Sequence, residues 1–243
     1  MRPAHIALLV AGLLVLAISA FGQAFVPIET FSNYQVEIKI MENGDARVTH
    51  RITIRNNDRD SPIVPGIAYL NVFNNQEKNL EIEDISATMA NGSRLVHFLQ
   101  SRGDYFEIRF ELWFPLGPQK EQEVVIEYTA KNFYPKNGLF RTIQFPVGES
   151  TIPIEKSRIL LDSPLAITYA PDAQLENGKW SWNLGTIPSG ESKSIEFEAS
   201  NVPLPQLPIK GAYVFYSLVT IVGLIVIVVT ASWLRKRRKR GGR

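Results

Sequence analysis

The sequence predicts an all-β protein, with two tandem β-sandwich modules followed by one C-terminal transmembrane helix. Three observations predict this architecture. Apolar and polar residues alternate with a period of two over much of residues 34–199, Gly and Pro turns separate the alternating runs, and the uncharged stretch 212–234 directly precedes a basic tail. A period of two is that of a half-buried strand, and an uncharged apolar stretch of this length can cross a bilayer as a helix.

The chain begins with the pattern of a secretory signal peptide. Arg2 precedes an apolar run over residues 6–18, and small residues at Gly22 and Ala24 suit cleavage after Ala24. An uncleaved signal anchor is the alternative, but this run is short for a span that needs about 20 residues. We therefore expect residues 1–24 to be removed as a signal peptide.

Residues 25–132 form the first predicted module, which opens with a hairpin. Apolar residues alternate with polar ones over residues 34–40 and again over residues 48–54. A two-residue Asn43-Gly44 loop would put the two apolar faces out of phase. We therefore expect a three-residue loop, Glu42 to Gly44, with Gly44 at positive φ. Further strands with the same alternation are expected over residues 105–112 and 124–128.

Residues 133–200 form the second, smaller predicted module. A turn-rich segment around Asn132 to Leu139 marks the boundary, and short alternating runs follow it. Near the end of the module, Trp180 and Trp182 lie on one face of a predicted strand. The turn at 188–191 joins this strand to a closing strand whose apolar residues are Ile195, Phe197 and Ala199.

The end of the second module resembles the last hairpin of the immunoglobulin-like repeat domains common on archaeal and bacterial surface proteins. The shared pattern is a Trp strand, Leu184-Gly185, then Gly190-Glu191 and a closing strand, all within residues 178–199. The resemblance implies Ig-like sandwiches. Residues 105–130 repeat the pattern more loosely and suggest that the first module ends in the same way.

The opening segment, residues 34–57, resembles the start of the extracytoplasmic domain in a family of prokaryotic membrane proteins of unknown function. In that family an Asn-Gly or Asp-Gly hairpin leads into a Val-Thr-x-x-Ile strand, which is matched here by Asn43-Gly44 and by Val48 to Ile52. The segment is similar, more distantly, to the first luminal domain of ribophorin-type oligosaccharyltransferase subunits. Neither resemblance brings an active residue to this chain.

The chain ends in a predicted membrane anchor. Three prolines in residues 201–211 predict an extended stalk of about 30 Å, at about 3.1 Å per residue. Residues 212–234 would span roughly 35 Å as a helix and can cross a hydrocarbon core of about 30 Å once. The basic tail, residues 235–243, marks the cytoplasmic side, so the N-terminus and both modules are expected outside the cell membrane.

The tail itself is interpreted as a stop-transfer anchor. Binding of anionic lipid headgroups is the more specific alternative, because each cation near the bilayer surface contributes about 1 kcal/mol to the free energy of membrane binding. The residues that would meet the headgroups are Arg235, Lys236, Arg237, Arg238, Lys239 and Arg240.

Composition narrows the class of protein. The sequence has no cysteine, so disulfides do not hold the exported part together, which favours a prokaryotic, archaeal surface protein. All 24 acidic residues lie in residues 25–210, with only 18 of the 26 basic ones. An acidic exterior disfavours nucleic acid as a partner.

Residues suited to catalysis are scarce. The only histidines beyond the signal are His50 and His97, and each is expected to be a satisfied sheet residue rather than a ligand. No phosphate loop, zincin motif or penicillin-recognising motif occurs. We therefore expect no enzyme activity and no cofactor. Trp113, Phe114 and Tyr134 could form a recognition patch, although packing is the expected role.

Two polar motifs remain. Asn56, Asp58 and Asp60 offer oxygen ligands at alternate positions, as at the opening of a calcium loop, but the Gly and Glu that complete such a loop are absent. A polar turn is the expected structure and calcium is the alternative. Asn91 begins the N-glycosylation sequon Asn91-Gly92-Ser93, in a predicted turn.

The leading interpretation is a non-enzymatic, type I membrane protein that presents β-sandwich modules outside the membrane for protein or envelope binding. Its expected partners are the bilayer, anionic lipid headgroups at the tail and an unidentified membrane or envelope protein. An accessory subunit of a membrane complex, such as one for glycan transfer or protein export, is the second interpretation. A calcium-dependent surface module or enzyme is the third.

Overall fold

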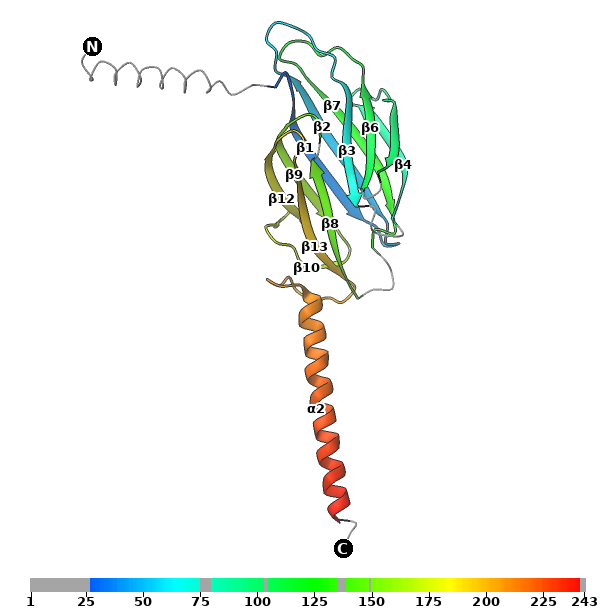
Figure 1. Cartoon of the computed structure of the whole chain (residues 1–243), viewed down its shortest axis with the longest axis vertical. Coiled ribbons are helices and arrows are strands. Elements are labelled where there is room, and N and C mark those ends of the chain that lie inside the picture. Colours follow the sequence, from blue (N-terminus) through cyan, green and yellow to red (C-terminus); the bar gives the residue numbers. More distant parts are fainter. Residues whose placement is uncertain (1–26, 75–79, 103–104, 135–138, 149, 241–243) are drawn as a thin grey trace, which may run out of the picture.

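The computed structural model confirms an all-β protein with one C-terminal helix (Figure 1). The structure describes residues 27–74, 80–102, 105–134, 139–148 and 150–240, so the predicted signal peptide, residues 1–24, lies outside the described residues. Thirteen strands precede the helix in these ranges. They are β1 (Glu29–Ile40), β2 (Ala46–Asn56), β3 (Gly66–Asn74), β4 (Glu81–Met89), β5 (His97–Ser101), β6 (Tyr105–Leu112), β7 (Glu121–Lys131), β8 (Phe140–Gly148), β9 (Ile154–Asp162), β10 (Ala166–Tyr169), β11 (Gln174–Glu176), β12 (Lys179–Ile187) and β13 (Ser192–Ser200), followed by α2 (Gly211–Arg240).

The strands form two layers. The first layer is a seven-stranded sheet in the order β11-β12-β9-β1-β2-β7-β4. The second consists of two three-stranded sheets, β10-β13-β8 and β3-β6-β5, which meet where β3 lies beside β8. Figure 1 shows β3, β8 and β13 in front of the large sheet. Apolar side chains that alternate inward from both layers build one core between them.

Strands from both predicted modules pair in the large sheet. β1 runs parallel to β9, with Val36 opposite Ile159 and Ile38 opposite Leu161. These four side chains are fully buried. The boundary predicted near residue 132 therefore separates the two small sheets of the second layer, but it does not divide the first layer.

The predicted opening hairpin and its loop are confirmed. β1 pairs antiparallel with β2, and Ile40 lies opposite Ala46. The Met41 N–H donates to the Asp45 carbonyl at 2.8 Å, which leaves Glu42 to Gly44 as the three-residue loop. Gly44 has a φ of 86°, in the left-handed region that disfavours side chains with a Cβ.

The hairpin implied by the immunoglobulin-like resemblance at residues 178–199 is wrong. β12 belongs to the large sheet and β13 to a small sheet, so the turn between them crosses from one layer to the other. The rings of Trp182 and Phe197 meet across the core with centroids 6.0 Å apart. β6 and β7 are likewise split between the layers. Alternation predicts which face of a strand is buried but not which layer the strand joins, because both layers bury one face.

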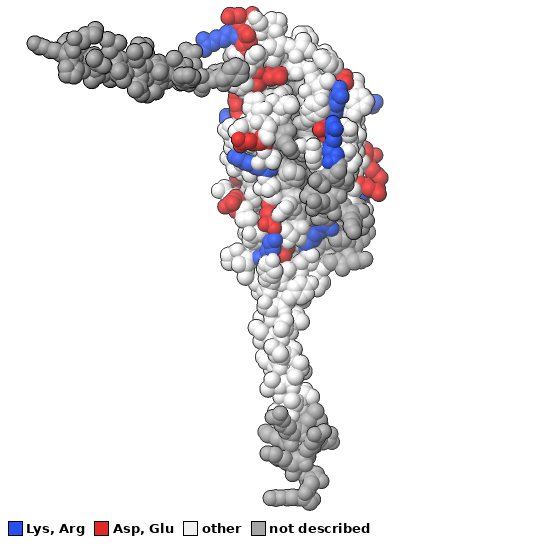
Figure 2. All heavy atoms as spheres, in the orientation of Figure 1, with Lys and Arg blue, Asp and Glu red and all other residues white. Residues whose placement is uncertain are grey.

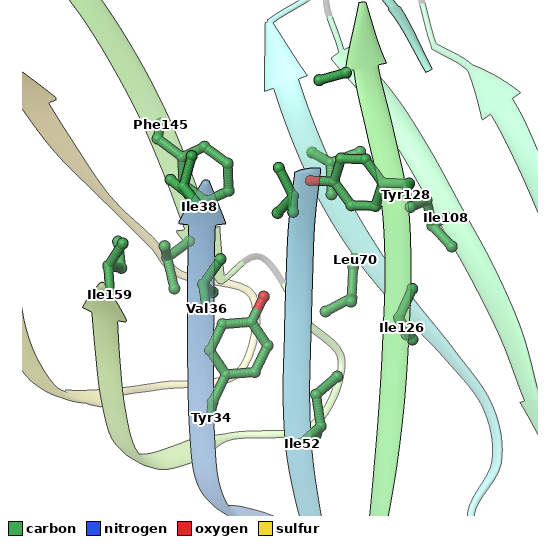
Figure 3. Packing of buried hydrophobic residues seen from close by; sticks show 14 of the residues in the cluster. Tyr34, Val36, Ile38, Ile52, Leu70, Ile108, Ile126, Tyr128, Phe145 and Ile159 are labelled. Atoms are coloured by element: carbon green, nitrogen blue, oxygen red, sulfur yellow. The ribbon is translucent and has the colours of Figure 1, made fainter. Parts of the chain in front are cut away.

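A polar chain lies inside the core. The Tyr34 hydroxyl is 2.8 Å from Nδ1 of His50, and Nε2 of His50 is 3.2 Å from the Tyr128 hydroxyl. All three side chains are buried. Figure 3 shows the two tyrosine hydroxyls turned toward β2, the strand between them that carries His50. A neutral imidazole has one donor and one acceptor, so the two tyrosines satisfy both ring nitrogens.

The predicted stalk does not hold the sandwich away from the helix. The Leu207 N–H donates to the Thr168 carbonyl at 2.9 Å, so residues 201–210 fold back on the end of β10. The carboxylate of Glu198 then accepts from the Thr168 hydroxyl at 2.5 Å and from the Ala212 N–H at 3.2 Å. Glu198 therefore caps α2, because the first amides of a helix have no partner within it.

The first residue of α2 must be small. A Cβ on Gly211 would lie 2.8 Å from the Cβ of Thr168 and 3.1 Å from a carboxylate oxygen of Glu198. Real Cβ atoms do not approach other atoms so closely, and Thr168 and Glu198 are both buried. The helix therefore begins in direct contact with the small sheet β10-β13-β8.

The buried histidine predicts a pH dependence of stability. Burial lowers the pKa of His50 from 6.5 to about 3. Because the unfolded chain binds this proton near pH 6.5 and the folded chain does not, the free energy of unfolding should fall as the pH falls from about 6.5 to 3. In His50→Gln, an amide can still donate and accept but does not titrate, so the fall should be shallower. Urea denaturation across this pH range measures it, and equal slopes for the two proteins would contradict a neutral His50.

Candidate functional site

The structure holds the two histidines in separate sheets. His50 lies in the core chain described above, and His97 lies in β5, where its Nδ1 is 3.1 Å from the Leu95 carbonyl. Among the described residues, no group of three or more His, Asp and Glu side chains could hold a metal ion. Within the described residues, His50 and His97 therefore do not share one site.

The predicted calcium ligands shape their own loop. Asn56 is buried, and its Nδ2 donates to the carbonyls of Ser61, Leu116 and Gly117 at 2.9, 3.0 and 3.1 Å. Its Oδ1 accepts from the Asp58 N–H at 2.8 Å. Asn56 thus closes the loop after β2 against the loop before β7.

Asp58 continues the same loop from outside. Its Oδ1 accepts from the N–H groups of Asp60 and Ser61 at 2.8 and 2.9 Å, and these bonds hold the pKa of the Asp58 carboxyl below its ordinary value. Asp60 is exposed. These bonds show that the side chains of Asn56 and Asp58 stabilise the turn. Calcium binding stays a prediction, which a calcium titration can test.

The other two predicted sites are the glycosylation sequon and the basic tail. Asn91 is exposed in the turn after β4, and its Oδ1 accepts from the Ser93 N–H at 2.9 Å, so the sequon is accessible and glycosylation stays a prediction. The helix α2 continues through the basic residues to Arg240. The side chains of Arg235, Lys236, Arg237, Arg238, Lys239 and Arg240 lie outside the described part of the structure, and their contact with lipid headgroups stays a prediction.

The surface feature best suited to binding another chain is strand β5. It ends the small sheet β3-β6-β5 and pairs only with β6 among the described strands. The Glu111 N–H of β6 donates to the Val96 carbonyl at 2.9 Å. Because main-chain groups alternate in direction along an antiparallel strand, those of His97 and Leu99 point to the outer edge. We call the segment from Val96 to Gln100 the β5 edge.

The β5 edge exposes apolar side chains on both of its faces. Val96 is 54% exposed, Phe98 53% and Leu99 38%. The segment contains no charged residue and no proline, which are the usual protections of an edge strand against pairing with another chain. Trp113, just beyond the end of β6, is 64% exposed.

Charged groups flank this apolar strand. The Arg109 guanidinium lies 6.0 Å from the centre of the Phe98 ring, and Glu111 accepts from the Trp113 Nε1–H at 2.9 Å. The side chains line a hollow of about 400 Å³. Its lining residues are Phe98, Leu99, Gln100, Arg109 and Glu111. The hollow thus brings the apolar side chains of Phe98 and Leu99 together with the Arg109–Glu111 ion pair, whose charged atoms lie 3.9 Å apart.

The β5 edge has no distinctive motif in the sequence. Of the aromatic residues proposed as a patch, Tyr134 is buried, Phe114 packs against the core and only Trp113 is largely exposed. The available signal was the uncharged run Leu95 to Ser101, which is too short to show whether its apolar residues face a core.

Comparison with known proteins places the whole sandwich in one family. The model described as "Predicted membrane protein (DUF2207) N-terminal domain" matches residues 30–206. The chain is also 30% identical over 135 residues to the uncharacterized protein MJ1395 of Methanocaldococcus jannaschii, a match that covers 55% of this chain and 92% of that protein.

Solved structures show only a distant likeness. An M1 zinc metallopeptidase of Deinococcus radiodurans is 11% identical with a TM-score of 0.38, and the match covers 71% of this chain and 42% of the peptidase. Leukotriene A4 hydrolase of Saccharomyces cerevisiae is 8% identical with a TM-score of 0.40, over 75% of this chain and 33% of the hydrolase. This chain therefore spans less than half the length of either structure.

Asn56 provides a test that separates a structural turn from a metal site. Asn56→Asp removes the donors to three carbonyls and places a carboxylate against them, so it should lower the free energy of unfolding by about 3 kcal/mol or more. Asp58→Asn keeps an acceptor oxygen at an exposed position and should cost less than about 1 kcal/mol. Denaturant melts of both variants, with and without calcium, measure this. If calcium stabilised the parent protein, and Asp58→Asn abolished that stabilisation, these residues would be metal ligands.

Proposed function

The chain belongs to the family of predicted membrane proteins known as DUF2207, and from this premise we propose that it is a non-enzymatic, single-pass protein that binds a partner protein outside the membrane. The N-terminus and the sandwich lie outside and the basic C-terminus lies in the cytoplasm, as the charge of the tail predicts. The sequence has no cysteine, and in the described structure both histidines beyond the signal lie within hydrogen-bonding distance of their own sheets.

The observation that carries this proposal is the β5 edge. An edge strand offers a row of main-chain donors and acceptors that an extended segment of another chain can extend as an added strand. Here the offered groups belong to His97 and Leu99, and apolar side chains flank them on both faces of the strand. Natural edges that must stay unpaired carry charges or proline, and this one carries neither.

The chemistry of the hollow defines the partner segment. An added strand would place alternate side chains over Phe98 and toward the Arg109–Glu111 ion pair, whose charged atoms lie 3.9 Å apart. An apolar residue suits the Phe98 ring, and a polar residue beside it can hydrogen-bond to the Arg109–Glu111 ion pair. The partner is therefore an extended segment of a membrane or envelope protein with alternating apolar and polar residues.

A second function, as an accessory subunit of a membrane complex, is favoured by the junction at Glu198. Because the Glu198 carboxylate binds the first turn of α2, the sandwich has a fixed orientation relative to the helix. A neighbouring membrane protein would therefore meet both in one arrangement. A partner in the same membrane could then contact α2 as well as the β5 edge.

Strand addition is tested by one pair of variants. Leu99→Pro removes an outward N–H together with the leucine side chain, at a position where an edge strand tolerates proline, whereas Leu99→Ala keeps that N–H and removes only the side chain. A photo-cross-linking residue at Val96 reports the partner in native membranes of the host. We expect the cross-link to persist in Leu99→Ala and to be at least about tenfold weaker in Leu99→Pro, with both variants melting close to the parent protein.

The outcomes of this experiment separate the alternatives. A cross-link that is equally strong in Leu99→Pro would contradict strand addition. A cross-link that depends on residues 211–243 as well would favour the accessory subunit over a free binding module. If cross-links form at Val64, just before β3, but none form at Val96, the partner-binding face is not the β5 edge.

A further inference from the structure

The junction between sandwich and helix fixes how close the sandwich comes to the bilayer. α2 starts at Gly211 against Thr168, and its first turn is capped by Glu198. Lys210, directly before the helix, pairs with Glu196 of β13 at 2.5 Å. No spacer therefore separates the small sheet β10-β13-β8 from the start of the membrane helix.

The length of the helix leaves little of it outside the bilayer core. The apolar span runs over 23 residues, from Gly211 to Trp233, and its most apolar 18 residues have a mean hydropathy of 2.6. At about 1.5 Å per residue it is roughly 35 Å long, against about 30 Å of hydrocarbon, so only about three residues can lie outside the core. Figure 2 shows no charged residue on the visible face of the described helix below the sandwich.

Part of the sandwich reaches down beside this span. The Phe140 ring, at the start of β8, lies 5.5 Å from the Phe215 ring and 6.1 Å from the Tyr216 ring, measured between centroids. Phe215 and Tyr216 are four and five residues into α2, about 6 to 8 Å along its axis. Even if all of the roughly three residues outside the core lay on the outer side, the Phe215 and Tyr216 rings would lie at the edge of the hydrocarbon core. Phe140, which contacts both rings, would lie at the same depth.

The side chains around Phe140 suit such a depth. Leu139 is 45% exposed, Tyr213 65% and Tyr216 53%. Tyrosine is enriched where headgroups meet hydrocarbon, and an exposed leucine beside it has no covering group in the described structure. The Lys210–Glu196 ion pair lies just beyond these rings, on the side away from the hydrocarbon core.

We propose that the base of the sandwich, formed by Leu139, Phe140 and the first turns of α2, is a lipid-contacting surface that inserts into the outer leaflet at headgroup depth. The partner is the bilayer itself. The apolar base then fixes the height of the sandwich above the membrane and adds apolar contact to the anchor.

The absence of cysteine makes a direct test available. Leu139→Cys, labelled with an environment-sensitive fluorophore in the full-length protein, is placed in phosphatidylcholine nanodiscs holding one protein each. Lipids with a spin label near the headgroup should quench this fluorophore at least about twofold. The control is Val64→Cys, which is 55% exposed and lies beside Glu29 and Ile152, at the opposite end of the sandwich, and should not be quenched.

Two results would overturn the proposal. Equal quenching of the two labels would mean that Leu139 lies as far from lipid as Val64 does. A blue-shifted Leu139 label that spin-labelled lipid fails to quench would mean that protein, not lipid, covers the base. Leu139 is a half-exposed loop residue, and an unchanged melting temperature of each labelled protein shows that the fold is intact.

Discussion

The structure depends on the parallel pairing of β1 with β9. The register that places Val36 beside Ile159 joins the first and second halves of the chain in one sheet, and the two small sheets then cover one continuous core. Parallel neighbours need a long crossover, and here the crossover contains strands β2 to β8. The β5 edge and the helix junction belong to different halves of the chain, and this pairing makes them parts of one body.

The second constraint is the cap that Glu198 places on α2. A buried carboxylate at the start of a helix is costly unless it is hydrogen-bonded, and here the Thr168 hydroxyl and the Ala212 N–H both donate to it. The same contact requires glycine at Gly211 and leaves no room for a spacer. It therefore determines how the sandwich meets the bilayer, and through the shared sheet it determines where the β5 edge is held.

Sequence reasoning predicted the elements that local rules determine. The three-residue loop ending at Gly44 followed from the phase of two alternating strands, and the membrane helix followed from its length and charge. The assignment of β12 and β13 to different layers was missed, because either pairing buries the same apolar faces. The junction was missed because Glu198 stands in an ordinary alternating strand, and only the folded chain shows that its carboxylate meets the start of α2. The β5 edge was missed because exposure depends on what packs against a strand.

Through the Glu198 cap, the sandwich and its anchor should form one rigid body, and a distance distribution can measure this. Spin labels at Val64→Cys and Thr220→Cys, in an otherwise cysteine-free chain, report the separation of the far end of the sandwich from the middle of α2 by pulsed electron resonance in nanodiscs. A rigid junction should give a single narrow distribution that broadens when Glu198→Ala removes the cap. A distribution that is already broad with Glu198 in place would contradict it.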